Sequence, residues 1–238
     1  ASHAPIPPVS DRKDKVKYQE SKINRKKFVS GQKNFGLGFN FCNFNASYRQ
    51  TLMEATRDIP AEELSALRDP ATRRGAFDRL VGTYLRPLYW HARRLVVVHE
   101  DAEDVVQETF IRAYDKIGTF RGGAGELGAW LYRIATNTAL TMLRRRRPGL
   151  FSSLDDVSRI LASRVAEECG EDADRTLVRF QQAILELPLK QRLVFNLRYY
   201  DRMPYGEIAR VLGQREETLK VNYHHAVQKL KEKLTREL

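Results

Sequence analysis

Cysteine is scarce in this chain: only Cys42 and Cys169 occur, and neither stands at a spacing used for metal ligands. Neither a disulfide framework nor a zinc site is therefore indicated. No apolar run approaches the length of about 18 residues that a membrane-spanning helix needs. The N-terminus also lacks the apolar segment of a secretory signal. These absences favour a reducing, cytoplasmic environment without membrane insertion.

Catalytic constellations are lacking too. The chain has no phosphate-binding glycine loop, no paired carboxylates in a cleft-like context and no nucleophile with a base at motif spacing. We therefore expect no enzyme activity, no cofactor and no metal. His224 and His225 do not change this expectation, because adjacent side chains on a helix point about 100 degrees apart and cannot chelate as an i, i+4 pair can.

Basic residues outnumber acidic ones, but the excess is unevenly distributed along the chain. The formal net charge is +11, and residues 1–52 carry +7 of it, with ten Lys or Arg against three Asp or Glu. The rest of the chain is only mildly basic. Local clustering is thus more informative than total charge, since phosphate neutralisation needs charges that lie close together on one surface.

The basic segment 1–52 is predicted to be a disordered N-terminal extension. Prolines lie close to its start, and Phe35–Phe44 alternates aromatic or aliphatic residues with Gly and Asn, which weaken both helix and strand. Three interpretations remain open. The segment is an arm that binds a protein or nucleic acid, a passive tail, or sequence upstream of a natural start at Met53.

Residues 61–148 show helical periodicity. A pattern begins near Ala61, Asp69-Pro70 suits the start of a second helix, and Asp101 is a candidate N-cap of a third. Two apolar stripes then recur at spacings of three and four residues: Val106, Phe110, Ala113 and Ile117 in one, and Leu127, Leu131, Ile134 and Thr138 in the other. Between them we expect a loop from Thr119 to Gly128, to which glycines at 122, 123, 125 and 128 would give backbone freedom.

The two amphipathic helices differ in charge. The first carries Asp104, Gln107 and Glu108 on its polar face, whereas the second carries Arg133, Asn137 and the arginines from Arg144. An acidic face beside a basic, aromatic-bearing one suggests two partners. We interpret the acidic face as binding protein and the basic face as binding nucleic acid.

Residues 149–174 are rich in Ser, Asp and Glu and are predicted to be a flexible linker. A second helical unit follows in 175–238. Within it, Pro204–Gly213 indicates a short helix ended by glycine, and Glu216–Leu234 a longer one, which together make a helix-turn-helix. The expected fold is therefore all-α, with two small helical domains joined by the linker.

The second helix of a helix-turn-helix lies in the major groove. Leu219, Tyr223, Val227 and Leu230 are spaced to pack inward, which leaves polar residues on the other faces: Arg215, Thr218, Lys220, Asn222, His224 and Gln228. Arg and Lys suit guanine edges or phosphates and Asn suits adenine, so the chemistry for reading DNA is available. An ordinary solvated helix would carry the same residue types.

Two long patterns carry a family resemblance. Residues 101–147 read DAEDVVQE-F-RAY-----FRG-------WLYRIA-N-A---LRRRR and resemble region 2 of bacterial sigma factors, in particular the extracytoplasmic-function (ECF) group. The later pattern LP---R-VF-LRYYD-MPYGEIA-VLG-----LK---HHAV-KLK resembles sigma region 4. The resemblance covers roughly Arg74 to Leu234 and leaves out the first fifty or so residues.

The resemblance implies a sigma factor that binds core RNA polymerase, recognises the minus-35 and minus-10 promoter elements as double-stranded and melted DNA, and assists melting. It implies polymerase contacts at Asp104, Gln107 and Glu108. It implies minus-10 contacts at Phe120, Arg121, Trp130, Arg133, Asn137, Arg144 and Arg145, with Tyr132 as a further aromatic group. It implies minus-35 contacts at Arg215, Thr218, Lys220, Val221, Asn222, His224 and His225.

Within that family reading, the loop and Asn137 would capture a flipped base and Trp130 would wedge at the point of strand separation, although Trp130 suits a core position equally well. Glu216 and Glu217 depart from the family pattern and should weaken nonspecific DNA binding. An anti-sigma factor is an expected partner, and it or another protein could dock on the N-terminal extension.

The competing interpretation is a stand-alone helix-turn-helix regulator, and a more remote one is an enzyme acting on nucleic acid. A plain regulator does not need the acidic helix and the aromatic element of Asp101–Asn137. That stretch favours the sigma factor.

Overall fold

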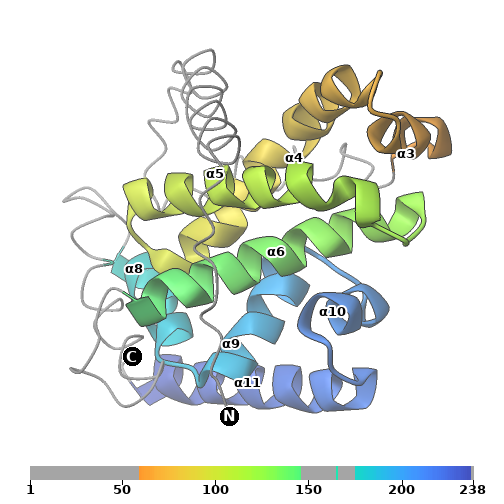
Figure 1. The fold of residues 1–238 in the computed structure, drawn as a ribbon. Coiled ribbons are helices and arrows are strands. Elements are labelled where there is room, and N and C mark those ends of the chain that lie inside the picture. Colours follow the sequence, from red (N-terminus) through yellow and green to blue (C-terminus); the bar gives the residue numbers. More distant parts are fainter. Residues whose placement is uncertain (1–58, 146–164, 166–174, 237–238) are drawn as a thin grey trace, which may run out of the picture. The chain divides into compact units, whose positions relative to one another are not determined.

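The computed structural model describes residues 59–145, 165 and 175–236 (Figure 1). All of these belong to one compact unit of the chain, residues 39–238. The described residues are helical and include no strand, which confirms the predicted all-α class. The extension 1–52, both cysteines, Arg146, Arg147 and nearly all of the linker lie outside the described residues.

In the first half, residues 59–145 form four helices and a short 3-10 turn. These are α3 (Ala61–Arg68), α4 (Arg73–Val96), α5 (His99–Lys116), the turn η1 (Ile117–Thr119) and α6 (Ala124–Arg145). The long helices α4, α5 and α6 each pack against the other two (Figure 1). The predicted apolar stripes of α5 and α6 form much of this core, and of their eight residues only Ile134 is not fully buried.

Two predicted helix starts are wrong. Helix α5 begins at His99 with Val98 at the N-cap, so Asp101 is not the cap but a buried residue of the first turn. The reason is a sharp reversal at Val97, whose φ of 67° turns the chain before any acidic residue is reached. Helix α4 begins at Arg73, because Asp69 instead forms a turn in which its Oδ1 accepts a hydrogen bond from the Ala71 amide at 3.0 Å.

The second half contains α8 (Arg175–Leu185), α9 (Leu189–Phe195), a π-helical stretch η2 (Asn196–Tyr200), α10 (Tyr205–Leu212) and α11 (Glu216–Arg236). Gly213 has a φ of 65° and ends α10, as a left-handed C-terminal glycine does. Leu219 and Leu230 of α11 are buried, while Tyr223 and Val227 are half-buried. The predicted helix-turn-helix is confirmed.

The end of α9 departs from an ordinary α-helix. Helix α9 starts after Pro188 and widens at η2, where the Asp201 amide donates to the Asn196 carbonyl five residues back at 3.2 Å. A wider turn shifts the faces on which the following side chains lie. Tyr200 and Asp201 are both buried as a result, next to α4 and α6 of the first half.

Candidate nucleic-acid and protein-binding surfaces

A short loop, Phe120–Gly123, joins η1 to α6 and is held from two sides. The Arg68 guanidinium of α3 donates through Nη2 to the carbonyls of Phe120 at 3.1 Å and Gly122 at 2.8 Å. The Glu126 carboxylate accepts a hydrogen bond from the Gly123 amide at 3.0 Å. Arg68 is 52 residues from Phe120 in sequence, so α3 braces a distant loop.

The predicted loop is too long, and two of the glycines on which its predicted freedom rested make close contacts. Gly125 and Gly128 lie within α6, which begins at Ala124. At Gly128 a Cβ would lie 2.9 Å from the Tyr84 hydroxyl, so this glycine permits close packing of α4 on α6. At Gly122 a Cβ would lie 2.5 Å from the Phe120 ring. These two glycines meet steric demands rather than loosening the chain.

Phe120 and Trp130 form an aromatic pair beside this loop. Their ring centroids lie 4.9 Å apart with the planes tilted by 40°, and both side chains are half-buried. Trp130 is therefore neither a fully buried core residue nor a fully exposed surface residue. The pair offers partly exposed aromatic surface of the kind on which unpaired bases stack.

Helix α6 presents a line of exposed residues that starts at this aromatic pair. Arg133, Asn137 and Arg144 follow Trp130 at intervals of three, four and seven residues, which places them on one helix face. All three are exposed, as are Arg121 in the loop and Arg145 at the helix end. From Trp130 to Arg144 this face is about 21 Å long. We use the name α6 face for Phe120, Arg121, Trp130, Arg133, Asn137, Arg144 and Arg145.

Tyr132 does not belong to the α6 face, and its predicted role is wrong. It is 1% exposed, its ring packs edge-on against His91 with centroids 5.0 Å apart, and its hydroxyl donates to Asp201 Oδ1 at 3.4 Å. Two residues after Trp130, a helical side chain points to the opposite side. Tyr132 is thus turned into the core, away from any strand on the α6 face.

The acidic residues of α5 also share one face, by their spacing of three and four residues. Asp104 is exposed, while Gln107 and Glu108 are half-buried. Glu108 Oε1 accepts a hydrogen bond from Arg112 Nε at 2.8 Å, which partly neutralises it. The strongest uncompensated charge of this face is therefore at Asp104.

The N-terminal half of α11 is open to solvent. Exposed residues there and just before it include most of the predicted minus-35 set: Arg215, Thr218, Lys220, Val221, His224 and His225. Asn222 is half-buried. Val221 is 53% exposed, which is unusual for an apolar side chain and suits contact with a thymine methyl group. Glu216 and Glu217 are exposed in the first turn, where their negative charges stabilise the helix through its dipole.

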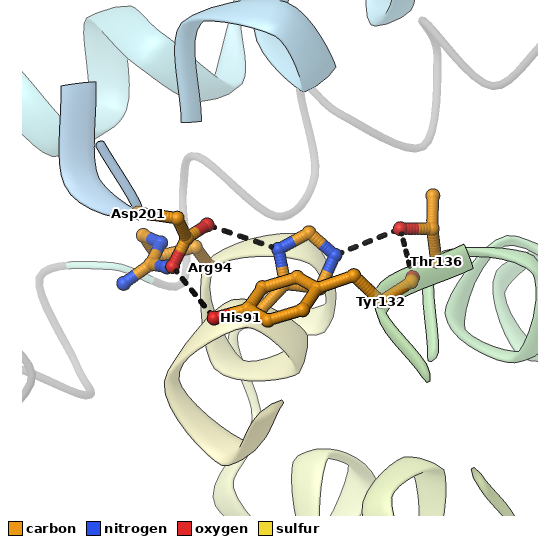
Figure 2. Close-up of polar contacts among 5 residues, drawn as sticks. All are labelled: His91, Arg94, Tyr132, Thr136 and Asp201. Atoms are coloured by element: carbon orange, nitrogen blue, oxygen red, sulfur yellow. Dashed lines mark hydrogen bonds and ion pairs between the residues drawn. The ribbon is translucent and has the colours of Figure 1, made fainter. Parts of the chain in front are cut away.

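One buried polar cluster was not predicted from the sequence. Asp201, which is 0% exposed, lies between η2 and α10 and receives a hydrogen bond from Arg94 Nη2 at 2.6 Å (Figure 2). His91 Nδ1 lies 3.3 Å from its other oxygen, and His91 Nε2 lies 2.8 Å from Thr136 Oγ1. The available signal was His91 and Arg94 three residues apart on the inward face of α4.

Known proteins match both halves. The sequence profile described as Sigma-70 region 2 matches residues 80–148, and that described as Sigma-70, region 4 matches residues 177–230. The ECF RNA polymerase sigma factor SigW of Bacillus subtilis (strain 168) is 32% identical over 167 residues, which are 67% of this chain and 89% of SigW. The chain belongs to the ECF sigma factors of the sigma-70 family.

Other similar proteins agree with this assignment. The ECF RNA polymerase sigma factor SigM of Mycobacterium tuberculosis is 33% identical over 147 residues, covering 62% of this chain and 71% of SigM. Among solved structures, CnrH in complex with the cytosolic domain of CnrY has a TM-score of 0.54 at 25% identity, covering 75% of this chain and all of that one. RpoE of Bartonella quintana in complex with the anti-sigma factor NepR has a TM-score of 0.51 at 26% identity, covering 67% and 96%.

This ECF sigma factor binds core RNA polymerase, recognises the minus-35 and minus-10 promoter elements and assists promoter melting. The presence of both regions decides against a stand-alone regulator. None of the helices in the described residues is long and apolar enough to cross a membrane.

Proposed function

We propose that the α6 face holds the melted minus-10 strand. The observation that carries this assignment is the shared helix face that runs from the half-buried Phe120–Trp130 pair through exposed Arg133 and Asn137 to the exposed terminal arginines. Aromatic rings stack on bases regardless of sequence, and the arginines follow the backbone. Asn137 has an amide that can donate to and accept from one flipped base.

The loop Phe120–Gly123 supplies the rim of that base site. Its backbone conformation is held by Arg68 and Glu126 before any DNA arrives. A surface fixed in advance loses little conformational entropy on binding. Base selection at minus-10 therefore depends partly on a helix, α3, that precedes the matched region 2 profile.

Helix α11 reads the minus-35 element as duplex. Lys220 and Arg215 supply guanine or phosphate contacts, and Val221 supplies an apolar contact, all from the exposed N-terminal half of the helix. His224 and His225 extend this surface. Glu216 and Glu217 lower affinity for phosphates in general, which leaves base contacts with a larger share of the binding.

The acidic face of α5 contacts the polymerase, with Asp104 as its principal charge. The protein has no catalytic role of its own in this scheme, because the polymerase forms the phosphodiester bonds. It works in the cytoplasm, where the polymerase is. The Bartonella quintana relative was crystallised with an anti-sigma factor, and we propose that an anti-sigma factor also holds this chain.

Run-off transcription with purified bacterial core polymerase tests the assignment of the two surfaces. Asn137→Ala should lower initiation on a duplex promoter and on one with mismatches over minus-10, because a base contact is lost in both. Lys220→Ala should lower initiation only on templates that keep a minus-35 element. If both variants behave alike on every template, the division of labour is wrong. A chain beginning at Met53 measures what the extension contributes.

A further inference from the structure

The buried cluster around Asp201 joins the two sigma regions. His91 and Arg94 come from α4 and Tyr132 from α6, all in region 2, whereas Asp201 follows η2 in region 4 (Figure 2). The polar contacts therefore bridge 69 to 110 residues of sequence, across the whole linker. Below, region 2 means residues 59–145 and region 4 means residues 175–236.

The chemistry of this pocket selects a carboxylate. Arg94 donates to one Asp201 oxygen at 2.6 Å, Tyr132 donates to the same oxygen at 3.4 Å, and His91 lies 3.3 Å from the other. The Asp201 side chain is 0% exposed and that of Arg94 only 3%. A charge buried this deeply needs a partner of opposite sign. The Arg94 guanidinium also lies 4.8 Å from the Tyr200 ring, so two consecutive region 4 residues are held.

We propose that His91, Arg94 and Tyr132 form a carboxylate-binding pocket on region 2, that Asp201 occupies it in the free protein, and that it must be vacated when the protein spans a promoter. The pocket thus acts as a latch between regions. Its promoter step rests on the proposed reading surfaces. Its occupancy in the free protein does not.

Promoter geometry requires the latch to open. Minus-35 and minus-10 elements are about 25 base pairs apart, which is roughly 85 Å at about 3.4 Å per pair. With the latch closed, α10 packs against both α6 and α11. Packed helix axes are about 10 Å apart, so the two reading helices pass within roughly 20 Å of each other. The stretch 146–174 can extend to about 100 Å, which permits separation.

The latch restrains the protein by holding the two reading surfaces close together. It does not cover either of them. Asn137 on α6 and Lys220 on α11 are both exposed while Asp201 is buried. Each reading surface is therefore accessible in the closed form, but the two cannot engage one promoter together. Binding of core polymerase to region 2, together with simultaneous binding of both promoter elements, would supply the free energy that opens the pocket.

The distance between the regions in the free protein tests the latch. Dyes placed at Lys116→Cys on α5 and Lys229→Cys on α11, with Cys42 and Cys169 replaced by serine, report separation by energy transfer. The unaltered pocket should give high transfer in the free protein and low transfer on core polymerase with promoter DNA. Asp201→Asn keeps the shape and removes the charge, so it should raise the open fraction about tenfold without polymerase.

Asp78→Asn is the matched control, because Asp78 is exposed on α4 and its loss removes the same charge. Circular dichroism shows whether each variant keeps its helices, and Arg94→Gln tests the pocket from its other side if Asp201→Asn does not fold. The proposal is overturned if folded Asp201→Asn and Arg94→Gln keep the transfer of the parent, or if the free parent is already open. Both of these outcomes are measured on the free protein without DNA, so wrong reading surfaces would not produce either of them.

Discussion

The two surfaces that we propose to read DNA in this sigma factor are built differently. In region 2 the α6 face lies beside the loop Phe120–Gly123, which Arg68 of α3 holds by hydrogen bonds. It also includes an aromatic pair, in which Phe120 of that loop packs against Trp130. In region 4 the residues proposed to read DNA stand on one helix, α11, apart from Arg215 in the turn just before it. A duplex brings its own rigid grooves, so a straight helix suffices to read it. Melted DNA brings no fixed shape, and the protein must supply one.

Removing the aromatic wedge should have the largest effect. Trp130→Ala removes a half-buried ring and exposes the Phe120 ring, and base stacking on such a ring is worth about 1–3 kcal/mol. We expect open-complex formation to fall by roughly 10- to 100-fold while duplex minus-35 binding stays unchanged. Fluorescence of 2-aminopurine in the minus-10 box measures the opening. Trp130→Phe should restore most of it, and an equal loss in both variants would argue against stacking.

Removing one charge from α11 should have a smaller effect of another kind. Lys220→Ala should weaken minus-35 duplex binding about fivefold and reduce the dependence of log K on log salt by about one unit, if Lys220 contacts a phosphate. Lys229→Ala removes the same charge further along α11 and is the control. Fluorescence anisotropy over a range of salt concentrations measures both. Equal slopes for the two variants would contradict a specific role for Lys220.

Loosening the brace should change selectivity more than stability. Arg68→Ala removes two hydrogen bonds to loop carbonyls that are partly screened by solvent, so about 1 kcal/mol or less is at stake. We expect up to about fivefold weaker discrimination among minus-10 bases with nearly unchanged Tm. Arg79→Ala is the control, since Arg79 pairs with Glu63 instead of the loop. Transcription from a set of single-base minus-10 variants decides between the two.

Alkaline pH should have the smallest effect, and it falls on region 4. Burial raises the pKa of the Tyr200 phenol well above its usual value near 10, and nearby Arg94 opposes this only in part. The native state therefore keeps a proton that the unfolded chain loses. Stability should be full below about pH 10 and decline above it. Tm measured from pH 8 to 11 should fall less steeply in Tyr200→Phe, and identical slopes would refute this assignment.

The local sequence pattern was enough to predict much of the fold. Apolar spacing gave α5, α6 and the helix-turn-helix, and Gly213 marked the end of α10. The glycines of α6 misled, because composition cannot distinguish a flexible loop glycine from one such as Gly128 that a tyrosine packs against. Helix spacing could have excluded Tyr132 from the α6 face, since it lies two residues from Trp130.

The latch was beyond local pattern for a different reason. Asp201 and Arg94 are 107 residues apart, and no local sequence pattern around either residue predicts that they pair. The widened turn at η2 also changes the direction of Asp201 relative to a regular helix. The assignments of Asp104, Asn137 and Lys220 to their partners remain predictions, and their exposure is what they require. Predictions for residues 1–52 and the linker lie outside the described residues.

In the proposed complex the α6 face also sets a length. It spans about 21 Å from Trp130 to Arg144, and a helix cannot stretch. The number of nucleotides held between these two residues would therefore depend on the number of helical turns that separate them. Lengthening α6 by one turn between them, about 5.4 Å, would lengthen the stretch of strand that is held by about one to two nucleotides.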